Sequence, residues 1–114
     1  TLSERLSLRG FENNTVFNGE QALEFLAENR VDIMVLDLKM PGIDGMEVLR
    51  RIRENNQKLM IIVQTGHGTD KEEEETGQLG VSSFLRKPVD IEILIDALQD
   101  AATSLKNNED QGEE

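Results

Sequence analysis

The stretch VDIMVLDLKMPGIDG, residues 31–45, decides the fold of this chain. Its first part, from Val31 to Leu36, is apolar except for Asp32 and is too short for a helix to be favoured. A continuous apolar run of this length is typical of a strand covered on both faces, as in a parallel sheet. Asp37 follows at the carboxyl end of the predicted strand, the edge where open parallel sheets place their sites. We therefore expect Asp37 to lie where such a fold has its functional site.

The second part of the same stretch predicts a turn followed by a helix. Residues 40–42 (Met-Pro-Gly) predict the turn, and Asp44 is placed to cap the amino end of the helix. This helix should run to about Asn55. Its apolar residues recur on one side, and its arginines take the more exposed sides: Met46, Leu49 and Ile52, against Arg50, Arg51 and Arg53.

Helical and extended patterns alternate along the rest of the chain. We expect helices at residues 1–9, after the cap Asn18, at residues 70–78 and after Pro88, and strands at residues 11–17, 59–63 and 81–86. Asn18 and Gln21 form a capping-box pattern at the second helix, and Asp90 caps the last one. Residues 64–69 should be a loop, and Gly80 should end the fourth helix. This alternation predicts a single α/β domain with a parallel sheet and right-handed crossovers.

Composition narrows the class of protein. A chain of 114 residues without cysteine is one domain that has neither disulfides nor thiolate metal sites. The formal net charge of −11 argues against direct nucleic-acid binding, which needs clustered Lys and Arg. The chain has no apolar run of membrane-spanning length and no secretory signal, so we expect a cytoplasmic protein. The acidic runs at residues 72–75 and after Lys106 predict a solvated helix face and a disordered tail or linker, which places the domain at residues 1–105 and the tail at 106–114.

Two further motifs follow predicted strands: Thr65 lies in VQTGHG (63–68), and Lys87 lies in FLRKP (84–88). Together with the stretch around Asp37, and in this order, they closely resemble the receiver domains of response regulators in two-component signalling, the CheY-like superfamily. The resemblance extends from Thr1 to about Leu105. It implies a flavodoxin-like, doubly wound sheet of five βα units with strand order 2-1-3-4-5.

The resemblance implies that Asp37 accepts a phosphoryl group from a histidine kinase or phosphotransfer protein, in a signalling domain that assists its own phosphorylation and dephosphorylation rather than in an enzyme. A carboxylate can attack phosphorus to form an acyl phosphate, but its charge opposes the anionic donor, so cations must help. Mg²⁺ is the implied cofactor. Its implied ligands are Asp37, the backbone carbonyl of Lys39 and an acidic residue that this sequence does not contain.

Lys87 and Thr65 are the other implied site residues. The ammonium of Lys87 suits pairing with a phosphoryl oxygen, and the Lys87–Pro88 bond resembles the cis peptide of the family. The alternative for Lys87 is a solvent-reaching lysine before a proline, and for Thr65 it is an ordinary loop threonine. Phe84 occupies the place of the family's rotating aromatic, with a core or edge-strand phenylalanine as the alternative. His67 and Lys39 occupy positions that vary among receivers and border the pocket, and we assign His67 no catalytic or metal role.

One departure from the family concerns the start of the chain. Receivers begin with a central strand that ends in an acidic pair, whereas this sequence opens inside the first helix. We expect about 12–20 residues to be missing from an incomplete domain, by ordinary element lengths. The strands expected at 11–17 and from Val31 would then flank an empty position, and the 114 residues alone should be molten or aggregated.

Phosphorylation is implied to draw Thr65 inward, make room for Phe84 and shift the surface formed by the fourth helix, last strand and fifth helix. An output domain or effector protein would read that surface, and homodimerisation is one implied response. Two alternatives remain open. One is a pseudo-receiver, an interaction module without phosphorylation chemistry. The other is a flavodoxin-like cofactor binder, for which no Gly-rich or Ser/Thr-rich phosphate loop is present.

Overall fold

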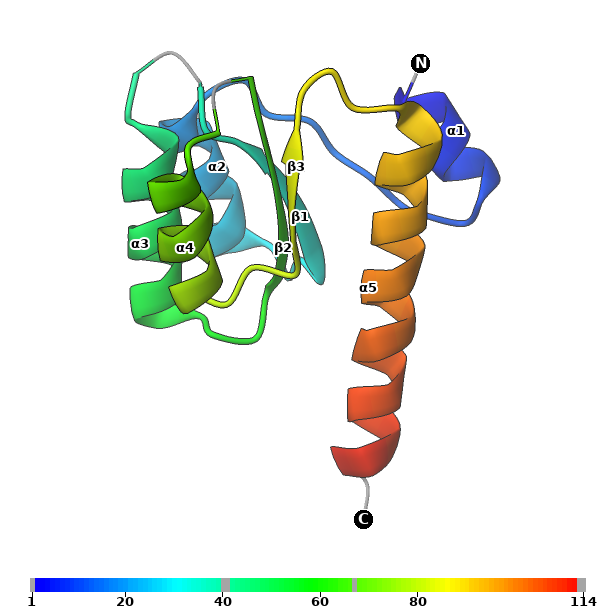
Figure 1. The fold of residues 1–114 in the computed structure, drawn as a ribbon. Coiled ribbons are helices and arrows are strands. Elements are labelled where there is room, and N and C mark those ends of the chain that lie inside the picture. The colour runs from blue at the N-terminus through cyan, green and yellow to red at the C-terminus, as the bar shows by residue number, and fades with distance from the viewer. Residues whose placement is uncertain (1, 40–41, 67, 113–114) are drawn as a thin grey trace.

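A parallel sheet lies between two layers of helices in the computed structural model, which describes residues 2–39, 42–66 and 68–112 (Figure 1). In chain order the elements are α1 Leu2–Leu8, α2 Gly19–Glu28, β1 Ile33–Asp37, α3 Gly45–Asn55, β2 Met60–Thr65, α4 Asp70–Gln78, β3 Ser83–Arg86 and α5 Ile91–Gly112. Helices α2, α3 and α4 cover one face of the sheet, and α1 and α5 lie on the other. The predicted α/β class is confirmed.

The described strands form one sheet in the order β1-β2-β3, with both pairs parallel. Asp37 is in register with Gln64, and Thr65 is in register with Arg86, so the three strands end at the same edge. This order corresponds to the last three strands of the expected 2-1-3-4-5 sheet. The edge that carries Asp37 is therefore the carboxyl edge, as the sequence predicted.

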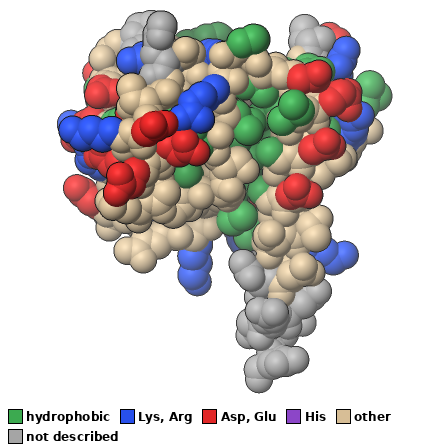
Figure 2. Space-filling model, in the orientation of Figure 1, with side chains coloured by type: hydrophobic (Ala, Val, Ile, Leu, Met, Phe, Trp, Pro, Cys, Tyr) green, Lys and Arg blue, Asp and Glu red, His purple; other side chains and the backbone are tan. Residues whose placement is uncertain are grey.

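The core has two parts, one on each face of the sheet. The part under α2, α3 and α4 consists of Leu36, Leu38, Met46, Val48, Leu49, Ile52, Leu59, Ile61 and Val63. The part under α5 and α1 consists of Leu6, Ile62, Leu94, Ile95, Leu98 and Ala101. The middle residues of β2 are completely buried because this central strand is covered on both faces. Figure 2 shows hydrophobic side chains gathered between the body of the domain and α5.

Local capping signals are largely confirmed. The side chain of Asn18 accepts from Gln21 N at 2.9 Å, that of Asp44 from Met46 N at 3.2 Å, and that of Asp90 from Glu92 N at 2.8 Å. The predicted capping box at Asn18 is half formed, because Gln21 Oε1 accepts from Phe17 N instead of from the cap residue. Gly10 and Gly80 end their helices at φ of 87° and 75°.

The strand predicted at residues 11–17 is wrong, because residues 11–16 have no regular structure and residue 17 is a bend. A strand requires a neighbour for its backbone groups, and among the described residues none pairs with the outer edge of β1 or with this segment. Asn13 instead binds back to α1, where its side chain bonds the hydroxyls of Ser3 and Ser7 at 2.6 and 3.2 Å. Phe17 is 76% exposed. The outer flank of β1 is also thinly covered, since Ile33 and Val35 are only partly buried.

The prediction that Arg53 is exposed is also wrong. Arg53 is buried, and its guanidinium donates to the carbonyls of Leu79 at 2.7 Å and Gly80 at 3.2 Å, and to that of Asn56 at 3.1 Å. Burial lowers the pKa of this guanidinium from its ordinary value. The last carbonyls of α3 and α4 have no partner within their helices, and they bind the guanidinium of Arg53. The helical period of apolar residues does not predict such a contact.

Several boundaries differ from the prediction; β3, for example, begins at Ser83 rather than at Val81. β2 continues to Thr65, so Gln64 and Thr65 belong to the strand rather than to the loop. α5 runs to Gly112, where the sequence predicted a disordered tail or a linker from Lys106. Adding residues to a helix that already exists requires no new nucleation, so even a polar segment can extend it. Within the described residues, no helix is both long and apolar enough to cross a membrane.

Candidate functional site

The carboxyl ends of the three strands bring the predicted site residues together. Asp37 ends β1, Thr65 ends β2, and Lys87 directly follows β3. Backbone hydrogen bonds continue past the strands, from Leu38 N to the Gln64 carbonyl at 3.2 Å and from Lys87 N to the Thr65 carbonyl at 2.8 Å. Thr65 thus lies on the strand between the two that carry the carboxylate and the ammonium.

Asp37 and Lys87 form an ion pair across this edge. Lys87 Nζ donates to Asp37 Oδ2, and the backbone N–H of Lys39 donates to Oδ1 at 2.9 Å. The Asp37 side chain is 24% exposed and that of Lys87 is 42% exposed, so the pair is oriented by the protein yet open to solvent. The Lys87–Pro88 bond is cis, as the family resemblance implies. A carboxylate held beside a cation at the surface can meet an anionic donor.

Thr65 is completely buried at the end of the central strand. This placement differs from the alternative of an ordinary loop threonine, because β2 includes the residue and its carbonyl accepts from Lys87 N. Its methyl group lies against the backbone of Gly68, where an added Cβ would be only 2.9 Å from Thr65 Cγ2. Its role toward a phosphoryl group stays a prediction.

Phe84 packs, partly buried, against the core under α2, α3 and α4. This core contact fits the alternative of a core phenylalanine. Phe84 is in register with Val63, two residues before Thr65 on β2. Gly68 and Arg86 also neighbour this ring, and neither contact was predicted from the sequence. The contact with Arg86 could have been predicted from the two-residue period of a strand, because residues 84 and 86 point to the same face of β3.

The implied metal ligands are present in part. A carboxylate and a backbone carbonyl are oxygen donors that Mg²⁺ prefers, and Lys39 follows Asp37 closely at an exposed position. Among the described residues no group of three or more acidic, histidine or cysteine side chains could hold a metal. The expected turn residues Met40 and Pro41, and His67, lie outside the described residues.

Comparison with protein families identifies the class of protein to which this fold belongs. A model of the response regulator receiver domain family matches residues 1–99. The chain belongs to this family, the receiver domains of two-component signalling.

Known relatives and structures agree. The chain is 33% identical over 98 residues to Sporulation initiation phosphotransferase F of Bacillus subtilis (strain 168), a match covering 86% of this chain and 79% of that protein. It is 35% identical over 100 residues to Transcriptional regulatory protein GlrR of Escherichia coli (strain K12), covering 88% of this chain but only 22% of GlrR. The crystal structure of a response regulator receiver protein from Pseudomonas putida superposes with a TM-score of 0.81 at 31% identity, covering 87% of this chain and 84% of that one.

Proposed function

We propose that this receiver takes a phosphoryl group onto Asp37 from the phosphohistidine of a histidine kinase or phosphotransfer protein. One observation carries the proposal: the Asp37 carboxylate is paired with Lys87 at the edge where the strand of Thr65 also ends. Each of the three residues comes from a different strand end. A structural ion pair would not require a hydroxyl residue at the end of the strand between its partners.

In the transfer step an oxygen of the Asp37 carboxylate attacks phosphorus and forms a new O–P bond. The N–P bond of the donor phosphohistidine breaks, and its electron pair stays on the imidazole nitrogen, which takes a proton as it leaves. The Lys87 ammonium neutralises charge on the phosphoryl oxygens as a point charge. The N–H of Lys39 holds the carboxylate in orientation through Oδ1.

The same proposal includes Mg²⁺, held by Asp37 and the backbone carbonyl of Lys39. These two oxygen donors would hold the ion together with water, which is a common mode of binding for Mg²⁺. When bound, the cation supplies further charge neutralisation at the phosphoryl oxygens.

The phosphorylated form is proposed to bind Thr65 through its hydroxyl and to change the surface made by α4, β3 and α5, where an output domain or effector protein reads it. Coupling energies of about 1–3 kcal/mol, roughly 5- to 150-fold in partner affinity, are enough. The name and length of GlrR support an output region in longer relatives. A cytoplasmic location and dimerisation on phosphorylation complete the proposal.

The experiment is incubation with acetyl phosphate and Mg²⁺, followed by intact-mass analysis and hydroxylamine treatment. We expect one hydroxylamine-labile phosphoryl group on the full-length wild-type protein and none on its Asp37→Asn variant, with Asp32→Asn as the matched control that still accepts it. Label that persists in Asp37→Asn would refute the assignment. A folded wild-type protein that takes no label would favour the pseudo-receiver interaction module.

A further inference from the structure

Arginines, rather than apolar side chains, hold α4 in place. Thr76 is the only buried residue of this helix. Arg53 binds the carbonyls of Leu79 and Gly80 at its carboxyl end, and Arg50 pairs with Glu75 along its side. A helix with so little apolar burial has little hydrophobic energy to fix its position. Its position therefore depends on polar contacts, and those at its amino end come from β3.

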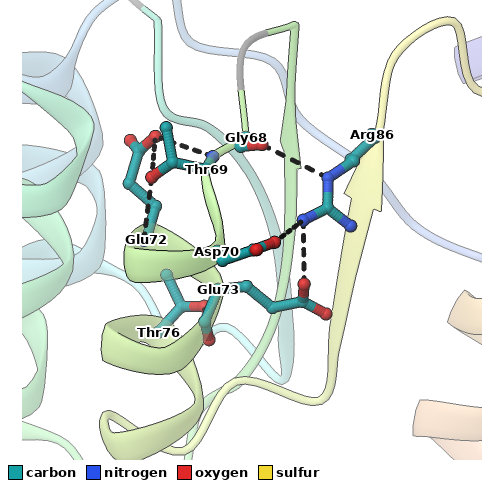
Figure 3. Close-up of polar contacts among 7 residues, drawn as sticks. All are labelled: Gly68, Thr69, Asp70, Glu72, Glu73, Thr76 and Arg86. Atoms are coloured by element: carbon teal, nitrogen blue, oxygen red, sulfur yellow. Dashed lines mark hydrogen bonds and ion pairs between the residues drawn. The ribbon is translucent and has the colours of Figure 1, made fainter.

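Arg86 makes those contacts at the amino end of α4 (Figure 3). Its Nε donates to the carbonyl of Gly68 at 3.3 Å, and its Nη2 lies 2.9 Å from Glu73 Oε1 and 3.5 Å from Asp70 Oδ1. Asp70 opens the helix, and Glu73 lies one turn further along it. A single side chain thus joins the end of β3 to the loop after Thr65 and to the first turn of α4.

The same guanidinium covers the ring of Phe84. Arg86 Cζ lies 5.3 Å from the ring centroid, within the range of a cation–π contact. Gly68 packs on the ring as well, since a Cβ there would lie 2.7 Å from Cε1 and 2.8 Å from Cζ of Phe84. The ring is therefore held by the Gly68 backbone and the Arg86 side chain, which are bonded to each other.

We propose that Arg86 is a positioning residue that latches the Phe84 ring and the first turn of α4 in the resting arrangement. The Arg86 latch consists of Arg86 with Gly68, Asp70, Glu73 and Phe84. It rests on the proposed function in one respect, namely that the latch opens when Asp37 is phosphorylated. Its resting geometry stands independently of that function.

The connection to the site runs through the chain itself. Gly68 is three residues beyond Thr65, and a Cβ added to it would lie 2.9 Å from the Thr65 methyl group. A movement of Thr65 toward a phosphoryl group displaces Gly68, whose carbonyl holds Arg86 and whose backbone packs on the ring. Release of Arg86 then frees both the ring and the amino end of α4. The ion pairs resist this movement only weakly and in a salt-dependent way, because Arg86 and Glu73 are about half exposed and Asp70 is fully exposed.

The test uses Arg86→Gln and Glu73→Gln, with Arg50→Gln as the matched control. Arg50, on α3, also pairs with a glutamate of α4, Glu75. It is a control because the arginine that lies over the Phe84 ring is Arg86. The readouts on unmodified protein are the NMR ring resonances of Phe84 and hydrogen exchange at the Glu73 amide, which bonds the Thr69 carbonyl at 2.9 Å.

For Arg86→Gln and Glu73→Gln we expect shifted Phe84 resonances and about two- to fivefold faster exchange at Glu73. High salt should reproduce most of this change in the wild type and add little in Arg86→Gln. Arg50→Gln should leave the Phe84 resonances at their wild-type positions. The proposal would be overturned if both latch variants behaved as the wild type. It would also be overturned if Arg50→Gln shifted the Phe84 resonances as much as they do.

A second arm adds acetyl phosphate and Mg²⁺. The Phe84 resonances of unmodified Arg86→Gln should lie between those of the unmodified and phosphorylated wild type. A shift in the opposite direction would refute the link to switching. A wild type that takes no phosphoryl group would refute the proposed function, while the first arm would still decide on the latch.

Discussion

Gly45→Ala should destabilise the domain and disturb the site by displacing Leu38, which follows Asp37. Gly45 is the first residue of α3, and a Cβ there would lie 2.5 Å from Leu38 Cα, 2.8 Å from its carbonyl oxygen and 2.9 Å from its carbonyl carbon. Carbon atoms in good contact are about 3.5–4.0 Å apart, so a gap of roughly 1–1.5 Å must open. The neighbour is backbone, which cannot rotate away as a flexible side chain could.

Overpacking of this kind costs about 1–3 kcal/mol, and the better helix propensity of alanine returns at most about 1 kcal/mol. We therefore expect a net loss of about 1–2 kcal/mol in the free energy of unfolding. Leu38 directly follows Asp37, and its N–H bonds the Gln64 carbonyl. Displacing Leu38 should therefore also slow phosphorylation of Asp37 by acetyl phosphate.

The assay is urea unfolding followed by far-UV circular dichroism, with Gly77→Ala as control. Gly77 lies inside α4 with nothing within 4 Å of an added Cβ, so alanine there should stabilise by about 0.5–1 kcal/mol. The two glycine-to-alanine changes should thus shift the midpoint in opposite directions. A Gly45→Ala midpoint at or above the wild-type value would refute the reasoning from close packing.

Two further predictions concern cations. Lys87→Ala should reduce the rate of phosphorylation by acetyl phosphate about 10- to 100-fold, because one charged donor is worth roughly 1.5–3 kcal/mol; an unchanged rate would return Lys87 to the role of a solvent-reaching lysine. Arg53→Ala should lower the free energy of unfolding by about 1–3 kcal/mol, because three hydrogen bonds from a buried charged group are lost, whereas exposed Arg51→Ala should change it by less than about 1 kcal/mol. Equal urea midpoints for the two arginine variants would contradict the buried role of Arg53.

Local patterns carried much of the prediction. The strand before Asp37, the caps at Asn18 and Asp44, and the bounds of α4 follow from interactions within a few residues, which a sequence displays directly. The convergence of Asp37, Thr65 and Lys87 was also predictable, because parallel strands end at one edge whatever their exact lengths.

Tertiary contacts decided the rest. Residues 11–17 read as a strand, but a strand exists only when another one pairs with it, and among the described residues none does so. Arg53 read as exposed, yet its partners lie 26 and 27 residues away at the end of another helix. The contacts of Arg86 with the start of α4 carried no sequence signal, because its partners there lie 13 to 18 residues before it and become adjacent only after folding. Periodicity tells which side of an element is apolar, whereas the partner of a cation is set by how the elements pack.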